Sequence, residues 1–124
     1  MKIYIACKQQ VIGRLVYARL KSEGHEITAT WLNDHSYGNG EQTPNERGVK
    51  SLRCEHEIRK SNALIYINDG EGRGGRDVEM GIALALDLPI YLLGERLNTF
   101  HYHTSIQAFD DLEELLRCIQ SSKC

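Results

Sequence analysis

The chain has 124 residues, which predicts a single domain, residues 1–124, with one hydrophobic core. Its formal net charge of −2 provides no basic field for a nucleic-acid polymer or an anionic membrane. No run approaches the roughly 18 apolar residues that span a bilayer, and no signal-peptide pattern opens the chain, so we expect a cytoplasmic protein with a small-molecule ligand.

The first part of the chain predicts a strand, a helix, a second strand and a long loop. An apolar run at residues 2–7 is typical of a buried strand, and apolar residues recur at helical spacing over 11–23 before Gly24. Residues 25–32 alternate and are rich in β-favouring types, which predicts a second strand. The polar residues 33–45 predict a long loop, a kind of segment that is often functional.

The middle of the chain predicts a helix, a strand and a second helix. Residues 47–61 indicate a charged helix, and the apolar run 63–67 indicates a buried third strand. The apolar side of the first of these helices is expected to carry Val49, Leu52 and Ile58. A glycine-rich stretch then leads to residues 77–88, whose apolar positions predict an almost wholly buried helix.

The last part of the chain predicts two short strands and a closing helix. Residues 89–93 are short and apolar, as a buried fourth strand would be. Residues 98–105 indicate an irregular loop rich in aromatic residues and histidine, followed by a weak fifth strand at 106–109. Residues 111–120 predict the last helix.

This alternation of strands and helices predicts an α/β three-layer sandwich with a five-stranded, mainly parallel sheet. At this chain length the flavodoxin-like (Rossmann-like) strand order 2-1-3-4-5 is the natural one. The first and third strands are then neighbours at the point where the strand order reverses. The tip of the first strand, Asp69 and Glu79 should therefore surround one crevice.

Glu79 is the strongest candidate for a functional residue. It lies in the first turn of the helix at 77–88, directly after the glycine-rich loop. An acidic residue there can simply complement the helix dipole, which is worth about 0.3–1 kcal/mol. Its apolar neighbours Val78 and Met80 instead favour a carboxylate directed into the crevice at the carboxyl end of the third strand.

No histidine, serine or cysteine base system accompanies Glu79 in the sequence. This leaves nucleophilic attack by the glutamate itself or general acid/base work. Glycosyl chemistry fits such a site, because an oxocarbenium-like transition state needs an anion beneath the anomeric carbon and acceptors for the sugar hydroxyls. Glu79 can supply the anion, with Asp69 and Asp77 as acceptors.

The glycine-rich loop offers a second chemical possibility, the binding of a phosphate. Its GEGRGG run, residues 70–75, matches GxGxxG only weakly, and no GK[ST] of a Walker sequence follows. Loop amides, Arg73 and Arg76 can still hold a phosphate at the start of the following helix. The equally weighted alternative is that both arginines are solvated loop charges.

At these residues the chain resembles the nucleoside 2-deoxyribosyltransferase-like family. The matching segments are KIYIA (2–6), SNALIYIND (61–69), GGRDVEMGIALALDLPIYLLG (74–94), and NTFHYH (98–103) followed by Phe109. The resemblance implies a flavodoxin-like fold, a covalent glycosyl-enzyme mechanism with Glu79 as nucleophile, and a nucleoside or nucleotide substrate. It also implies a carboxylate such as Asp69 on the sugar and an aromatic residue near the first strand, for which Tyr4 is the candidate.

The expected site thus combines two catalytic residues with a set of substrate-binding residues. The catalytic pair is Glu79 and Asp69, and the substrate-binding residues are Tyr4, Gly74, Gly75, Arg76, Asp77, Asn98 and His101. Some of these have ordinary structural alternatives: Tyr4 is as plausible in the core, Asn98 as a turn cap and His101 as a loop residue.

The expected activity is cleavage or transfer of the N-glycosidic bond of a (deoxy)nucleoside or nucleotide. It requires no cofactor, and the four cysteines show no CxxC or other ligand-like spacing that indicates a metal site. Two other functions stay open: a non-catalytic module that binds a nucleotide or an ADP-ribose-like ligand, and an NAD glycohydrolase. A homodimer or higher homo-oligomer is also possible, through the apolar helix at 77–88.

Overall fold

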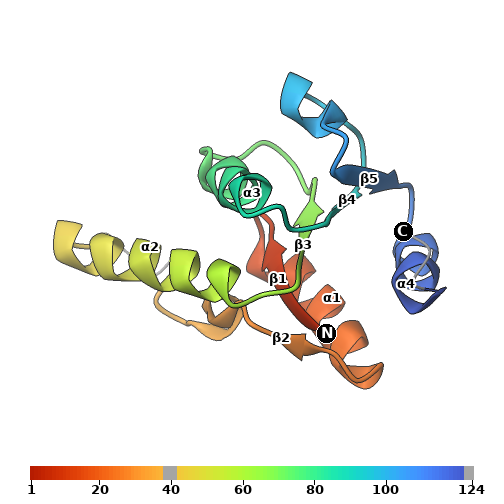
Figure 1. Ribbon diagram of the computed structural model, residues 1–124. Helices are drawn as coiled ribbons and strands as arrows, with labels where there is room; N and C mark the ends of the chain where they lie inside the picture. The colour runs from red at the N-terminus through yellow and green to blue at the C-terminus, as the bar shows by residue number, and fades with distance from the viewer. Residues whose placement is uncertain (38–41, 122–124) are drawn as a thin grey trace.

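The structure is a computed structural model, and it describes residues 1–37 and 42–121. Five parallel strands form one sheet in the order β2-β1-β3-β4-β5 (Figure 1), which confirms the predicted α/β fold class and strand order. The strands are β1 (Lys2–Ala6), β2 (Glu26–Ile27), β3 (Ala63–Ile67), β4 (Ile90–Leu93) and β5 (Ile106–Phe109). The α-helices are α1 (Gln10–Ser22), α2 (Pro44–Arg59), α3 (Gly75–Ala85) and α4 (Leu112–Ser121).

The centre of the sheet is covered on both faces. Helices α2 and α3 lie on one side of it, and α1 and α4 lie on the other (Figure 1). All five residues of β3 are buried, which explains why this strand reads as an unbroken apolar run. Strand β1 pairs with β3 from Ile3↔Ala63 to Ala6↔Tyr66, so the carboxyl ends of these two strands lie side by side.

The second predicted strand is too long. Only Glu26–Ile27 pairs with β1, and a short 3-10 helix, η1 (Thr30–Asn33), replaces the end of the predicted strand. The reason is tertiary packing: Trp31 is buried and donates its indole N–H to the carbonyl of Ile5 at 3.1 Å. Alternation of residue types does not distinguish this arrangement from a strand.

Two predicted loops also contain helical structure. Helix α2 begins earlier than predicted, at Pro44, because Thr43 caps it by accepting a hydrogen bond from the backbone N–H of Glu46 at 3.1 Å. The remainder of the predicted loop 33–45 lies partly outside the described residues. The loop 98–105 contains the 3-10 helix η2 (Thr99–Tyr102), which is capped by Asn98.

Helix α3 is less buried than its apolar sequence predicts. Only Met80 and Ala83 are fully buried, whereas the side chain of Val78 is 64% exposed. One face packs against the sheet and α2, and the other remains open. Within the residues that the structure describes, no helix has the length and apolar character that a membrane crossing requires.

Candidate active site

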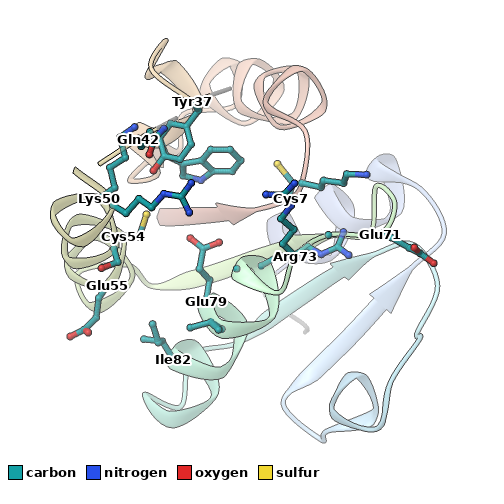
Figure 2. Close-up of a pocket in the computed structure, with 18 residues that line it drawn as sticks. Cys7, Tyr37, Gln42, Lys50, Cys54, Glu55, Glu71, Arg73, Glu79 and Ile82 are labelled. Atoms are coloured by element: carbon teal, nitrogen blue, oxygen red, sulfur yellow. The ribbon is translucent and has the colours of Figure 1, made fainter. Parts of the chain in front are cut away.

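A cavity of about 1030 Å³ opens at the carboxyl edge of β1, between α2 and the beginning of α3 (Figure 2). Its walls come from the end of β1, the segment around η1, one face of α2, the glycine-rich loop and the first two turns of α3. Such a cleft at the carboxyl ends of parallel strands is the usual ligand position in open α/β sheets. The tip of β1 and Glu79 thus surround one cavity as expected, whereas Asp69 is not among the residues that line it.

Glu79 lines this cavity, and its carboxylate points into it (Figure 2). The hydroxyl of Tyr4, a fully buried residue of β1, donates a hydrogen bond to Oε2 of Glu79. Burial raises the pKa of Glu79 from its ordinary value of 4.5 to about 7, although the hydrogen bond from Tyr4 opposes the rise. The carboxylate is thus a group that titrates near neutral pH.

Tyr4 is the permanent donor in this pair. Its burial, followed by the charge of Glu79, raises the pKa of the Tyr4 phenol far above its usual range. The phenol therefore keeps its proton at any ordinary pH and donates to whichever oxygen faces it. The expectation that an aromatic residue of the first strand belongs to the site is consistent with this contact.

Asp69 lies at the same edge of the sheet but does not line the cavity. Its side chain is only 5% exposed, and its two oxygens accept hydrogen bonds from the backbone N–H groups of Lys8 and Gln9, both at 2.8 Å. Arg76 also donates to it at 3.1 Å. The geometry is that of a clamp on the turn between β1 and α1, and the role of Asp69 in sugar binding or catalysis stays a prediction.

The side chain of Arg76 likewise forms its hydrogen bonds within the protein. Its guanidinium is 8% exposed and donates to the carbonyls of Ile67 and Gly70, at 2.9 and 2.8 Å, as well as to Asp69. It lines the cavity yet fastens the glycine-rich loop to the end of β3. Its availability to a phosphate, expected from the sequence, is therefore small.

The backbone N–H groups at the start of α3 can still bind an anion. Gly74 is the N-cap residue, with a φ of 101° that favours glycine, and no side chain caps the helix. The first N–H groups of a helix have no partner inside the helix, so they face the segment before it. Gly75, Lys8 and Arg73 line the cavity at this end, and the side chains of Lys8 and Arg73 are exposed.

Asp77, Asn98 and His101 are brought together, but not at Glu79. Asp77 accepts a hydrogen bond from the hydroxyl of Tyr66 at 2.7 Å, and its Oδ1 lies 3.7 Å from Nε2 of His101. Asp77 and Asn98 line a second cavity of about 620 Å³ that does not include Glu79. Contact of Asp77, Asn98 and His101 with a substrate therefore stays a prediction, and Asp77 and Asn98 line a different cavity from the one that holds Glu79.

His101 ties η2 to α3. It is 1% exposed, its Nδ1 accepts a hydrogen bond from the backbone N–H of Leu97 at 2.9 Å, and its ring lies edge-on to Tyr66. Burial lowers the pKa of His101 below its ordinary value, so the ring is neutral near pH 7. The arrangement is that of a satisfied core histidine.

The sequence interpretation missed one face of α2. The residues of α2 that line the cavity are Arg47, Lys50, Ser51, Cys54 and Glu55. Their spacing of three and four residues places them on one side of a helix, and that spacing was visible in the sequence. The predicted apolar side was wrong, since Val49 and Leu52 are 58% and 69% exposed and only Ile58 is buried.

No described group of three or more His, Cys, Asp or Glu side chains is placed to hold a metal ion. Fold and site together define an α/β domain in which the half-buried Glu79 accepts a hydrogen bond from the Tyr4 hydroxyl, in a cavity at the switch point of the sheet. No protein-family model matches the sequence, and no curated protein sequence matches it.

Two solved structures share this fold. One is a 2-deoxyribosyltransferase from the psychrotolerant bacterium Bacillus psychrosaccharolyticus, 20% identical, with a TM-score of 0.71 over 93% of this chain and 90% of that one. The other is a CMP N-glycosidase of Clostridium botulinum, 14% identical, with a TM-score of 0.63 over 98% and 99% of the two chains. At such identities the similarity establishes the fold, which is the one that the resemblance implied.

Proposed function

We propose that this protein cleaves or transfers the N-glycosidic bond of a (deoxy)nucleoside or nucleotide through a covalent glycosyl-enzyme intermediate on Glu79. The observation that carries the proposal is the carboxylate of Glu79 in the cavity, held by the hydroxyl of Tyr4. The two structural neighbours support it, because one transfers a 2-deoxyribosyl group and the other is an N-glycosidase of CMP.

The proposed reaction has two displacement steps. The ionised carboxylate of Glu79 attacks the anomeric carbon, the bond to the base nitrogen breaks with its electron pair going to the base, and the departing base takes up a proton. Water or a second base then attacks the same carbon and loses a proton to solvent, as the bond from that carbon to the Glu79 oxygen breaks and releases the carboxylate. Tyr4 keeps the oxygen that it contacts in place through both steps.

The positively charged side chains that line the cavity favour a phosphorylated substrate. Lys8 and Arg73 stand beside the uncapped start of α3, and Arg47 and Lys50 line the opposite wall on α2. The chain as a whole has a net charge of −2, so this local excess of cations is not a property of the entire surface. We assign the phosphate to Lys8, Arg73 and the first amides of α3, in place of Arg76.

The same cations favour a second candidate function, a non-catalytic module for a nucleotide or an ADP-ribose-like ligand. A cavity of about 1030 Å³ is also at the large end of small-molecule sites. This candidate predicts binding without product, and an NAD glycohydrolase predicts release of nicotinamide. The main proposal instead predicts release of a purine or pyrimidine base.

The experiment is chromatography of released base after incubation with deoxynucleosides, their monophosphates, CMP and NAD, each with and without an acceptor base. Glu79→Gln is the test variant and Glu71→Gln, an exposed loop glutamate of the same cavity, is the matched control. Release by the wild type and by Glu71→Gln, but not by Glu79→Gln, supports the proposal. Binding of a nucleotide without release of any base, in all three proteins, supports the binding module and contradicts catalysis.

A further inference from the structure

We propose that Lys50 makes the cavity selective for bases such as uracil and hypoxanthine, which carry an oxo group where cytosine and adenine carry an exocyclic amino group. The inference rests on the proposed function, because it takes Glu79 as the residue that attacks the anomeric carbon. The wall of the cavity that carries Lys50 has no part in the two displacement steps themselves.

The position of the base follows from the direction of the attack. In a displacement at the anomeric carbon, the leaving group departs on the side opposite to the nucleophile. Figure 2 shows the carboxylate of Glu79 pointing across the cavity toward the wall that carries Tyr37 and Lys50, and all three residues line the same cavity. Lys8 and Arg73, which are assigned to the phosphate, line it beside the start of α3. A base that departs from the side opposite Glu79 therefore meets the wall of Tyr37 and Lys50.

This wall provides a surface for a flat ring. Tyr37 and Trp31 meet edge to face, with ring centroids 5.7 Å apart, and both line the cavity. The indole of Trp31 is fixed in turn, because its N–H donates to the carbonyl of Ile5 at 3.1 Å. Stacking on an aromatic side chain binds bases of every kind, so these rings hold a base without distinguishing one from another.

The group that can distinguish bases is the ammonium of Lys50. Its Nζ lies 4.3 Å from the centroid of the Tyr37 ring and donates a hydrogen bond to Oγ of Ser36 at 2.6 Å. The hydroxyl of Ser36 itself donates to Oδ1 of Asp34 at 2.6 Å, and Arg53 donates to the other oxygen of Asp34 at 2.9 Å. The ammonium group is thus fixed beside the aromatic surface, and Ser36 uses one of its three N–H donors.

Two cationic side chains of α2 line this wall of the cavity. Lys50 and Arg47, which is one turn earlier, have hydrogen-bond donors and no acceptors. Among the residues that the structure describes, neither of them has an ion-pair partner. Glu55, the acidic residue of α2 that lines the cavity, is paired with Arg59 at 3.0 Å. The wall therefore presents donors to a ligand.

A group with donors only distinguishes an oxo base from an amino base. The oxo or amino group lies on the edge of the base farthest from the glycosidic bond, which is the edge that reaches across the cavity. An oxo oxygen accepts a hydrogen bond from the ammonium group, whereas an amino group at the same position is itself a donor. An amino base would leave two donors facing each other, which weakens binding. A departing oxo base also carries part of its new electron pair on the oxo oxygen, so Lys50 should stabilise the departure as well.

The test measures binding, and it needs no reaction. The only tryptophan of the chain, Trp31, lines this cavity, so its fluorescence reports a base that stacks there. Glu79→Gln, which lacks the proposed nucleophile, is titrated with dUMP, dCMP, dIMP and dAMP. We expect dUMP to bind about tenfold more tightly than dCMP, and dIMP about tenfold more tightly than dAMP.

Three further variants of the Glu79→Gln protein assign the preference to its cause. Lys50→Met keeps the length of the side chain but has no donor, so the preference should fall below about twofold. Lys50→Arg keeps donors only and should retain the preference. Lys60→Met is the control, because Lys60 is exposed after the end of α2 and does not line the cavity, and it should leave all four dissociation constants unchanged.

Four results overturn the inference: equal affinities within each pair, tighter binding of the amino base, a preference that survives Lys50→Met, or no binding of any of the four nucleotides. Loss of the preference in Lys50→Arg overturns it too, because the donors are still present. Base release by proteins that retain Glu79 tests the proposed function separately. A preference that depends on Lys50, in a protein that releases no base, leaves the assignment of Lys50 standing and contradicts catalysis, whereas base release with a preference that Lys50→Met does not change does the reverse.

Discussion

The hydroxyl of Tyr4 donates a hydrogen bond to Oε2 of Glu79, although the two residues are 75 positions apart in the chain. The contact joins β1, where Tyr4 pairs with Leu64 of β3, to the first turns of α3. It places a carboxylate with a pKa of about 7 in contact with a phenol that does not ionise. The pH dependence of activity and that of stability depend on this pair, and two further predictions concern other residues near the cavity.

The first concerns the pH dependence of activity. Because the nucleophile must be ionised, kcat/KM for base release should rise with pH to a midpoint near 7 and fall about tenfold for each unit below it. Tyr4→Phe removes a hydrogen bond that favours the ionised form, so the midpoint should move upward. Tyr17→Phe, on α1 beneath Lys21, should leave it in place. A profile that is flat between pH 5 and 8 would contradict the assignment.

The second concerns stability. The pKa of Glu79 is higher in the folded protein, about 7, than its ordinary value of 4.5, so its stabilising contribution is present below pH 4.5 and is lost as pH rises through 7. Glu79→Gln removes this loss. Relative to the wild type, the variant should gain up to about 3 kcal/mol in free energy of unfolding between pH 4 and pH 9. Urea denaturation at both pH values measures this, and a gain equal to that of Glu71→Gln would refute it.

The third concerns Asp69. Because its oxygens serve two backbone N–H groups and Arg76, Asp69→Asn should lower the free energy of unfolding by about 2–3 kcal/mol. Asp110→Asn, at an exposed position, should change it by less than about 0.5 kcal/mol. Chemical denaturation distinguishes the two. A stable Asp69→Asn variant with a raised KM would instead indicate the sugar-binding role expected from the sequence.

The fourth concerns the phosphate. Lys8→Ala and Arg73→Ala should each raise KM for a nucleoside monophosphate about tenfold, and should leave KM for the corresponding nucleoside nearly unchanged. Lys60→Ala, an exposed residue after α2, provides the control. Steady-state kinetics with both substrates measures the two KM values. An equal rise in KM for both would contradict the binding of the phosphate at this end of the cavity.

The sequence predicts most of the fold because buried parallel strands leave unmistakable apolar runs. Strand β3 was predicted at its observed bounds, 63–67, and the strand order followed from chain length and crossover rules. Strand β2 was overestimated, since the segment beyond Ile27 is shaped by the indole of Trp31 rather than by its own pattern. Glu79 was predicted because it follows a strand and a glycine-rich loop, whereas Tyr4 was predicted only from the family resemblance.

The other site residues were harder to predict for a physical reason. Whether a polar group at a sheet edge faces a ligand or its own backbone depends on tertiary contacts. Asp69 and Arg76 are residue types that often bind ligands, yet both side chains form hydrogen bonds with the backbone of the protein. Cys54 shows the opposite case: it lines the cavity, although a lone cysteine in a charged helix carries no sequence signal of such a position.

The measurement that tests the central claim most directly is mass spectrometry of the acid-quenched reaction, after digestion, with a 2′-fluorinated nucleotide that slows release of the sugar. The account predicts that the peptide containing Glu79 gains the mass of the glycosyl group, with the modification on Glu79, and that Glu79→Gln shows no such gain. Turnover with every glutamate unmodified at each quench time, or a glycosyl group on a residue other than Glu79, would contradict it.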